Sequence, residues 1–309
     1  GLKETFMENL NSKSPSQLLT TANIGIFNGV DAAIHSVFHA YGTKGSKFLT
    51  TSPTFGYYLP CAQMQGMETI TIPYELDNFK FPFIEIESEL KKKQYKILII
   101  CNPNNPTGSR LSPENIIQLA KLSPETLIVI DELYEAFTGD SVLPIVNFDI
   151  STNIVVLRSL SKTAGLAGLR IGFGIGHPNI INRILRVTGP YDINSFAVTA
   201  AFAALKDQSY INNYVQEVKS AKTWLKKILK QNKVKHHIDG GNYLLIWPKA
   251  KPSDINKCLR SEGILVRNMK GKNLIDGSIR VSIGTTIQMQ QFWEAFRKHE
   301  IIEANSIIR

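Results

Sequence analysis

The sequence predicts an α/β protein, with a large domain built on a mainly parallel sheet flanked by helices and a smaller C-terminal α+β domain. Over the first two thirds of the 309 residues, short runs rich in Ile, Leu and Val alternate with helix-like segments. The runs lack polar–apolar alternation, which is typical of strands covered on both faces. After about Ser195 this order gives way to one long helix followed by short strands and helices. We therefore expect a large domain over residues 1–205 and a small one over residues 206–309.

Six apolar runs are the expected strands of the large domain. They are Lys47–Thr51, Glu68–Pro73, Lys96–Cys101, Thr126–Asp131, Asn153–Arg158 and Leu169–Gly176. The segments between and after them have helical character and are Asp31–Tyr41, Gly56–Met64, Ser112–Lys121 and His177–Val187. Repeated strand–helix order predicts a largely parallel sheet with helices on both sides. In such sheets ligands bind at the carboxyl ends of the strands, where Asn105, Asp131 and Ser159 are expected to lie.

The remaining third of the chain opens with a long amphipathic helix, expected over Ser209–Lys230, that joins the two domains. The elements expected after it are a strand Asn242–Trp247, a helix Ser253–Glu262, strands Ile264–Arg267 and Ile279–Ile283, and a closing helix Ile287–His299. This mixture predicts the small α+β domain.

Composition excludes several classes of function. The formal charge is +9, but the lysine clusters have no interleaved aromatic residues, so we expect a solvated basic surface and no nucleic-acid partner. No uncharged apolar run reaches the roughly 18 residues of a membrane span. The three cysteines lie far apart without metal-ligand spacing, which favours reduced, buried thiols in a cytoplasmic protein and no metal site.

Four motifs carry the chemistry. They are Cys101-Asn-Pro-Asn-Asn-Pro-Thr-Gly108, Ile130-Asp-Glu-Leu-Tyr134, Arg158-Ser-Leu-Ser-Lys-Thr163 with Gly168-Leu-Arg170, and Ile279-Arg-Val-Ser-Ile-Gly284. Each motif alone is a weak signal, because Asn-Pro and Asn-Gly clusters are common in turns. Their joint order is specific. From about Asn28 to Thr286 the chain resembles fold-type I pyridoxal 5′-phosphate (PLP) enzymes of aminotransferase class I/II, and it is most similar to the histidinol-phosphate aminotransferase group.

The resemblance implies a set of cofactor-binding residues. Lys162 matches the lysine that carries PLP as a Schiff base and then moves the α-proton of the substrate. Asp131 matches the carboxylate that keeps the pyridine nitrogen protonated. Tyr134 and Asn105 match the donors to the phenolic oxygen of the ring. Phe55 matches the aromatic side chain that stacks on the ring.

The resemblance also assigns two anion sites. The cofactor phosphate is expected to bind Ser159, Ser161, Arg170 and the helix N-terminus formed by Gly29, Val30 and Asp31. Arg280 matches the arginine for the substrate α-carboxylate. Arg267 matches the arginine for the substrate phosphate in the histidinol-phosphate group.

Two departures from the family matter. Leu133 stands where family members usually have Ala, so a larger side chain is expected beside the ring. The family normally has about fifty or more residues before the segment that matches Asn28-Gly29, including an arm near the substrate and a tyrosine that reaches the cofactor of the neighbouring subunit, and neither is recognised in this sequence. The resemblance further implies a homodimer, because fold-type I sites lie between subunits.

The expected activity is ping-pong transfer of an amino group between an amino acid or amino phosphate, with L-histidinol phosphate as one candidate, and a 2-oxo acid such as 2-oxoglutarate. Two alternatives stay open. One is a PLP-dependent decarboxylase of the same fold, of the threonine-phosphate type. The other is a catalytically silent PLP-binding domain.

Overall fold

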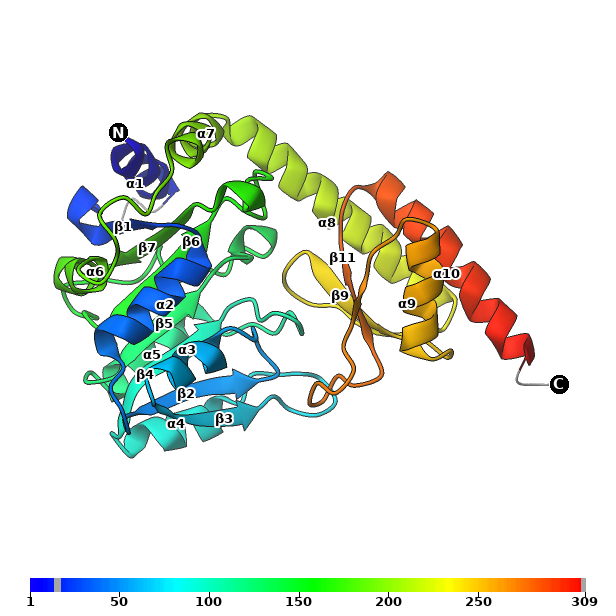
Figure 1. Cartoon of the computed structure of the whole chain (residues 1–309), viewed down its shortest axis with the longest axis horizontal. Coiled ribbons are helices and arrows are strands. Elements are labelled where there is room, and N and C mark those ends of the chain that lie inside the picture. Colours follow the sequence, from blue (N-terminus) through cyan, green and yellow to red (C-terminus); the bar gives the residue numbers. More distant parts are fainter. Residues whose placement is uncertain (14–17, 307–309) are drawn as a thin grey trace.

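The computed structural model of the protein describes residues 1–13 and 18–306 and contains a seven-stranded sheet (Figure 1). Its strands are β1 (Ile24–Phe27), β2 (Lys47–Ser52), β3 (Glu68–Pro73), β4 (Tyr95–Cys101), β5 (Leu127–Asp131), β6 (Ile154–Ser159) and β7 (Gly172–Gly176). Their spatial order is β1-β7-β6-β5-β4-β2-β3. All neighbouring pairs are parallel except those of β7, which runs antiparallel to β1 and β6. The predicted α/β fold with a mainly parallel sheet is therefore confirmed.

Helices cover both faces of this sheet. One face carries α2 (Val30–Tyr41), α3 (Tyr58–Met64) and α6 (Pro178–Leu185), and the other carries α1 (Leu2–Lys13), α4 (Phe83–Lys91), α5 (Pro113–Leu122) and α7 (Ser195–Lys206). Alternate residues of each central strand belong to opposite cores, as in β5, where Ile128 and Ile130 pack with the α5 side and Val129 packs with the α2 side. This double covering explains why the strands are continuously apolar.

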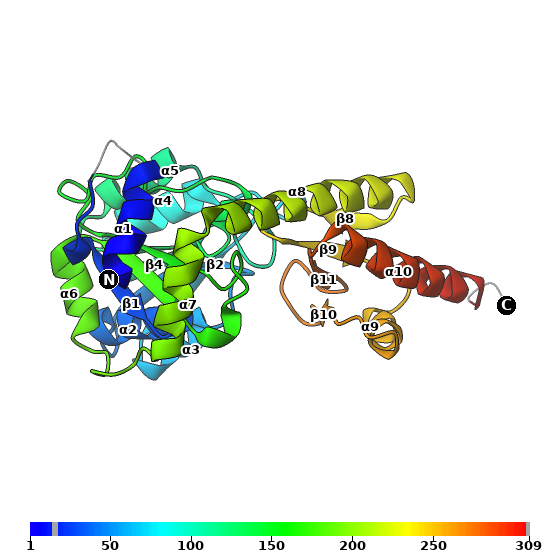
Figure 2. The same cartoon turned by 90° about the horizontal axis from the view of Figure 1, so that it is seen from above.

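A second, four-stranded sheet follows in the chain. It consists of β8 (Lys235–His237), β9 (Tyr243–Trp247), β10 (Arg267–Asn268) and β11 (Ile279–Ser282), in the order β10-β11-β9-β8, with every pair antiparallel. The helices α8 (Gln208–Gln231), α9 (Pro252–Ser261) and α10 (Thr286–Ser306) accompany it. The long α8 extends from the layers of the first sheet to those of the second (Figures 1 and 2). In residues 1–13 and 18–306, no helix is both long and apolar enough to cross a membrane.

Two of the expected strands were placed wrongly. Only Arg267 of the run Ile264–Arg267 is in a strand, because pairing with β11 begins at Arg267 and Leu265 is 72% exposed. The strand expected from Leu169 begins at Gly172, because Arg170 takes a left-handed conformation (φ +57°) at the end of a 3₁₀ turn over Ala167–Leu169. The closing helix also begins one residue before the predicted Ile287 and continues to Ser306.

Candidate active site

Three neighbouring parallel strands bring the predicted catalytic residues to one edge of the sheet. Asp131 is the last residue of β5, Ser159 is the last residue of β6, and Asn105 follows the end of β4. Lys162 lies three residues beyond Ser159, in the loop after β6. Because β4, β5 and β6 are adjacent and parallel, their carboxyl ends meet, as the sequence predicts.

Asp131 is a buried carboxylate, only 2% exposed, with no ion-pair partner among the described residues. Its Oδ2 accepts a hydrogen bond of 2.7 Å from the Tyr58 hydroxyl, and its Oδ1 accepts one of 3.2 Å from the Leu133 backbone N–H. Burial raises the pKa of Asp131 to about 6, although both hydrogen bonds oppose that shift. A cationic group at the free lone pairs of this carboxylate would favour its ionised form.

Lys162 is half-buried next to the aromatic side chain of Tyr134. Its Nζ lies 5.8 Å from the centroid of the Tyr134 ring, which packs edge-on against Tyr243 with 4.9 Å between centroids. Burial lowers the pKa of Lys162, and the positive charges of Arg280 and Arg170 lower it further, while Asp31 acts in the opposite direction. A lowered pKa leaves more of the amine neutral at pH 7, which is the form that attacks an aldehyde.

The N-terminus of α2 meets Arg170 at a position that only glycine fits. Gly29 precedes the helix with φ +83°, and a Cβ there would lie 2.6 Å from Arg170 Nη2. A Cβ at Gly172 would lie 2.6 Å from the carbonyl carbon of Gly29. Arg170 Nη2 also forms an ion pair of 2.7 Å with Asp31. Two glycines therefore allow a guanidinium to approach the free N–H groups at the start of α2, beginning with Val30.

The other residues predicted to contact the cofactor surround this cluster. Ser159 Oγ lies 2.7 Å from Ser161 Oγ and accepts a hydrogen bond of 3.0 Å from the Ser161 backbone N–H. The ring of Phe55 packs edge-on against Tyr58 with 5.5 Å between centroids. Tyr58 in turn contacts Asp131, so Phe55 belongs to the same continuous set of contacts.

Two arginines of the second sheet face the first sheet. Arg267 on β10 and Arg280 on β11 are direct cross-strand partners. Like charges at opposite positions destabilise a sheet, and neither arginine forms an ion pair with a described residue. An Arg280 Nη1–H donates to Oδ1 of Asn105, while Arg280 Nε is buried without a hydrogen-bond partner in the described part of the chain. This arrangement is suited to an anionic ligand.

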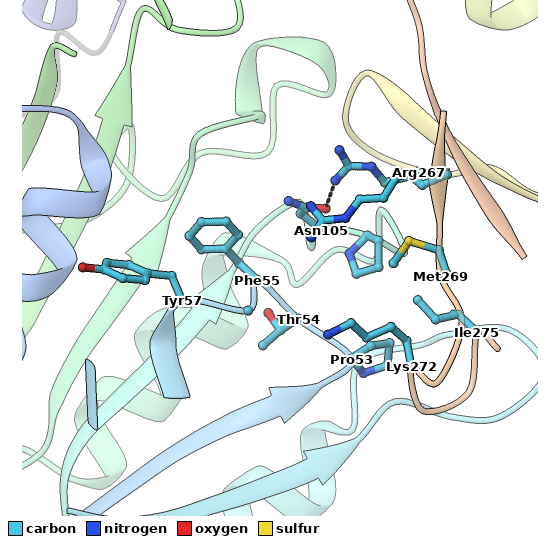
Figure 3. Close-up of a pocket in the computed structure, with 12 residues that line it drawn as sticks. Pro53, Thr54, Phe55, Tyr57, Asn105, Arg267, Met269, Lys272 and Ile275 are labelled. Carbon is cyan, nitrogen blue, oxygen red and sulfur yellow. Dashed lines mark hydrogen bonds between the residues drawn. The ribbon is translucent and has the colours of Figure 1, made fainter. Parts of the chain in front are cut away.

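Both arginines line a cavity of about 320 Å³ that also contains Phe55 and Asn105 (Figure 3). The cavity opens between the loop after β2 and the β10–β11 segment. Its volume matches a small metabolite. Asp131 and Lys162 do not line this cavity. It is therefore separate from the position that a ligand in contact with the Asp131 carboxylate would occupy.

Three residues near the site were not predicted from the sequence. Tyr58 holds Asp131, and Tyr243 connects the second sheet to the site by donating a hydrogen bond of 2.6 Å to the Asn104 carbonyl. Lys272 lines the same cavity as Arg267 and Arg280. No local motif marks them, because their positions depend on which segments the fold brings together.

The donor set fits a phosphorylated pyridine such as PLP. The cradle of Gly29, Gly172 and Arg170 leaves no room for a Cβ and presents a guanidinium beside a helix N-terminus, which suits a phosphate. The buried carboxylate of Asp131 has no cationic partner among the described residues and would gain one from a protonated ring nitrogen. The amine of Lys162 is partly desolvated, as imine formation requires.

Comparison with known proteins identifies relatives over most of the chain. The family model for aminotransferase class I and II matches residues 2–296. A dihydroxyacetone phosphate transaminase of Campylobacter jejuni is 32% identical over 288 residues, which cover 91% of this chain and 76% of that protein. A histidinol-phosphate aminotransferase of Thermoanaerobacter pseudethanolicus is 31% identical over 266 residues, covering 85% of this chain and 74% of that protein.

Solved structures share the fold. The histidinol-phosphate aminotransferase of Sinorhizobium meliloti, determined in complex with pyridoxal 5′-phosphate, superimposes with a TM-score of 0.85. The match covers 97% of this chain and 80% of that chain at 23% sequence identity, and it therefore supports the common architecture.

Proposed function

The chain belongs to the class I and class II aminotransferases, a PLP-dependent family, and we propose that it transfers an amino group between a phosphorylated amino compound and a 2-oxo acid. The observation that carries the substrate class is the cross-strand pair of Arg267 and Arg280 in one cavity, with no carboxylate among the described residues that line it. Two arginines can bind two separate anionic groups, or they can bind one phosphate dianion together. L-Histidinol phosphate as amino donor and 2-oxoglutarate as acceptor are the first substrates to test.

The residues proposed to hold the cofactor fall into three groups. Arg170, Ser159, Ser161 and the N–H groups at Gly29 and Val30 would bind its phosphate, with Asp31 orienting Arg170. Asp131 would accept a hydrogen bond from the protonated ring nitrogen, and Phe55 would cover one ring face. Asn105 and Tyr134 would donate to the phenolic oxygen.

When bound, PLP supplies an aldehyde that amines attack and a pyridine ring that takes up the electrons released at the substrate Cα. Lys162 Nζ would accept the proton from that Cα and donate it to the cofactor carbon that had carried the aldehyde, so that the amino group stays on the cofactor. The lowered pKa of Lys162 suits this role, because a base must be unprotonated at the working pH. The carboxylate of Asp131 would favour the protonated form of the ring nitrogen.

Three further properties belong to this proposal. Residues 1–205 and 206–309 would form two domains, which is supported by their separate sheets. A homodimer is supported by the side chains of Tyr191 and Phe196, which are 94% and 82% exposed. A cytoplasmic location agrees with three free cysteines, although Cys258 is only half-buried and not buried as expected for a core thiol.

Two experiments test the function. The purified protein is incubated with PLP, reduced with borohydride and digested, and mass spectrometry is expected to find the cofactor on Lys162. A different modified lysine would overturn the assignment of Lys162. The second experiment follows the two half-reactions separately: L-histidinol phosphate or glutamate is added to the PLP-loaded protein, and 2-oxoglutarate is then added to the protein aminated by L-histidinol phosphate.

The same assays separate the alternatives. Release of CO₂ from O-phospho-L-threonine without transfer of its amine would identify the decarboxylase. Covalent PLP that responds to none of the tested amines would identify the silent binding domain. Only amine transfer to 2-oxoglutarate agrees with the proposed function.

A further inference from the structure

The cavity beside the site contains a third cation that the family motifs do not include. The charged residues lining it are Arg267, Arg280 and Lys272, and no carboxylate occurs among the described residues that line it. Figure 3 shows the side chain of Lys272 extending from the β10–β11 segment towards Thr54 and Pro53. Three positive charges facing one small space repel one another, so a ligand with more than one negative charge would stabilise them.

The backbone around Lys272 is held in a defined conformation. The Lys272 N–H donates to the Met269 carbonyl at 3.1 Å, and the Lys272 carbonyl accepts from the Ile275 N–H at 3.2 Å. Ile275 is fully buried and Met269 is 6% exposed, so apolar side chains anchor both ends of this turn. Lys272 is therefore presented by a fixed turn, which lowers the entropic cost of using it to bind a ligand.

The nearby acidic residue does not neutralise Lys272. The Asp276 Oδ1 accepts hydrogen bonds from the backbone N–H groups of Gly271 and Gly277, at 2.8 and 2.9 Å. No salt bridge or side-chain hydrogen bond connects Lys272 to any described residue. Its ammonium group keeps all three donors for a ligand or for water.

We propose that Lys272 is a specificity-determining residue that binds the substrate phosphate together with Arg267, and so selects phosphorylated amino donors over unphosphorylated ones. This inference rests on the proposed function. Arg280 already donates a hydrogen bond to Asn105. Its remaining donors are therefore assigned to the carboxylate of the second substrate, or to one oxygen of the phosphate. Lys272 extends towards Thr54 from the turn between β10 and β11, the segment that also carries Arg267, and adds a third cation to the same cavity.

The test compares Lys272→Met with Lys270→Met in the PLP-loaded enzyme. Methionine keeps an unbranched side chain and removes the charge. Lys270 is an exposed lysine of the same segment that does not line the cavity, so its variant controls for net charge. Substrates are L-histidinol phosphate and L-histidinol, and inorganic phosphate serves as a competitive inhibitor.

For Lys272→Met we expect KM for L-histidinol phosphate and Ki for inorganic phosphate to rise about 10- to 100-fold, the loss of one charge-assisted hydrogen bond. The value of kcat/KM for L-histidinol and the affinity for PLP should stay within about twofold, and Lys270→Met should resemble the parent protein. An unchanged preference for the phosphorylated donor, or an equal effect of both variants, would overturn the inference.

Calorimetric titration of the loaded protein with inorganic phosphate separates this result from failure of the proposed function. If neither donor is turned over, the proposed function fails, but weaker phosphate binding in Lys272→Met alone would still support the phosphate site. If the parent protein transaminates while phosphate binding is the same in all three proteins, only the role of Lys272 is wrong.

Discussion

The hydroxyl of Tyr58 donates a hydrogen bond of 2.7 Å to Oδ2 of Asp131. Both residues are buried, and Tyr58 comes from α3 while Asp131 ends β5. The bond opposes the effect of burial, which raises the pKa of this carboxylate to about 6 even with the bond in place. Tyr58 therefore favours the ionised form of Asp131, which is the form that a protonated ring nitrogen requires.

Replacing Tyr58 with Phe should weaken PLP binding in a pH-dependent way. Without the donor, the pKa of Asp131 rises further, so binding at pH 6–7 must first remove a proton from the carboxyl group. We expect a loss of about tenfold in affinity near pH 6.5, the size of one hydrogen bond to a charged group. The loss should shrink towards pH 9, where Asp131 is ionised in both proteins. Equilibrium dialysis of PLP across this range measures it.

The control is Tyr74→Phe, which removes another buried tyrosine hydroxyl that contacts Thr51 and not Asp131. A purely structural role of Tyr58 would give an affinity loss that does not change with pH, and this outcome would exclude the positioning role.

Asp131→Asn should change the pH dependence of apoprotein stability. The folded-state pKa of Asp131 is raised from 3.8 to about 6, so its contribution to stability is complete below about pH 4 and is lost as the pH rises through 6. This loss is absent in the variant. Relative to the variant, the parent apoprotein should therefore lose about 2–3 kcal/mol of unfolding free energy between pH 4 and pH 8.

Urea unfolding at several pH values checks this prediction, with the exposed Asp149→Asn as a control. If the unfolding free energies of the parent protein and of Asp131→Asn changed with pH in parallel, the raised pKa of Asp131 would be contradicted. With PLP bound, the parent protein should instead be more stable to unfolding than Asp131→Asn at pH 8, because the ring nitrogen then supplies the missing cation.

The sequence alone predicts the site residues at the strand ends, but it does not predict the contacts between distant segments. Asp131 and Ser159 are predicted because continuous apolar runs mark strands β5 and β6 and the motifs fall at their ends. Tyr58 is missed because its contact with Asp131 depends on α3 packing over the strand ends. Lys272 is missed because nothing in the sequence shows that its turn faces Thr54.

Errors at the level of elements have a similar origin. The Ile264–Arg267 run is apolar enough to predict a strand, but tertiary structure leaves Leu265 72% exposed and pairs only Arg267 and Asn268. Helix α1 is not predicted, and only the fold brings Phe6 onto Phe173, with 3.8 Å between ring centroids. Short amphipathic segments of this kind depend on the surface that they cover.

Gly172→Ala should loosen the phosphate cradle. The added Cβ would lie 2.6 Å from the carbonyl carbon of Gly29 and 2.7 Å from Val30 N, and backbone atoms cannot move aside as a side chain can. We expect a destabilisation of about 1–3 kcal/mol together with weaker PLP binding. Thermal unfolding and PLP titration measure the two effects. Gly168→Ala is the matched control, because its Cβ would meet no atom within 4 Å.

Arg280→Ala should impair the use of glutamate far more than the binding of PLP. Arg280 lines the substrate cavity, and its contacts are with Asn105 and the ring of Tyr243, while the phosphate cradle around Arg170 lies elsewhere. Removing a bidentate partner of a carboxylate costs about 2–3 kcal/mol, so KM for glutamate should rise roughly 30- to 150-fold. The variant should also react with PLP at a higher pH, because the charge of Arg280 lowers the pKa of Lys162.

The control variant Arg280→Lys keeps that charge and should restore the pH profile of the reaction with PLP without restoring KM for glutamate. Equal losses of glutamate and PLP affinity in Arg280→Ala would mean that the residue stabilises the fold instead of binding substrate.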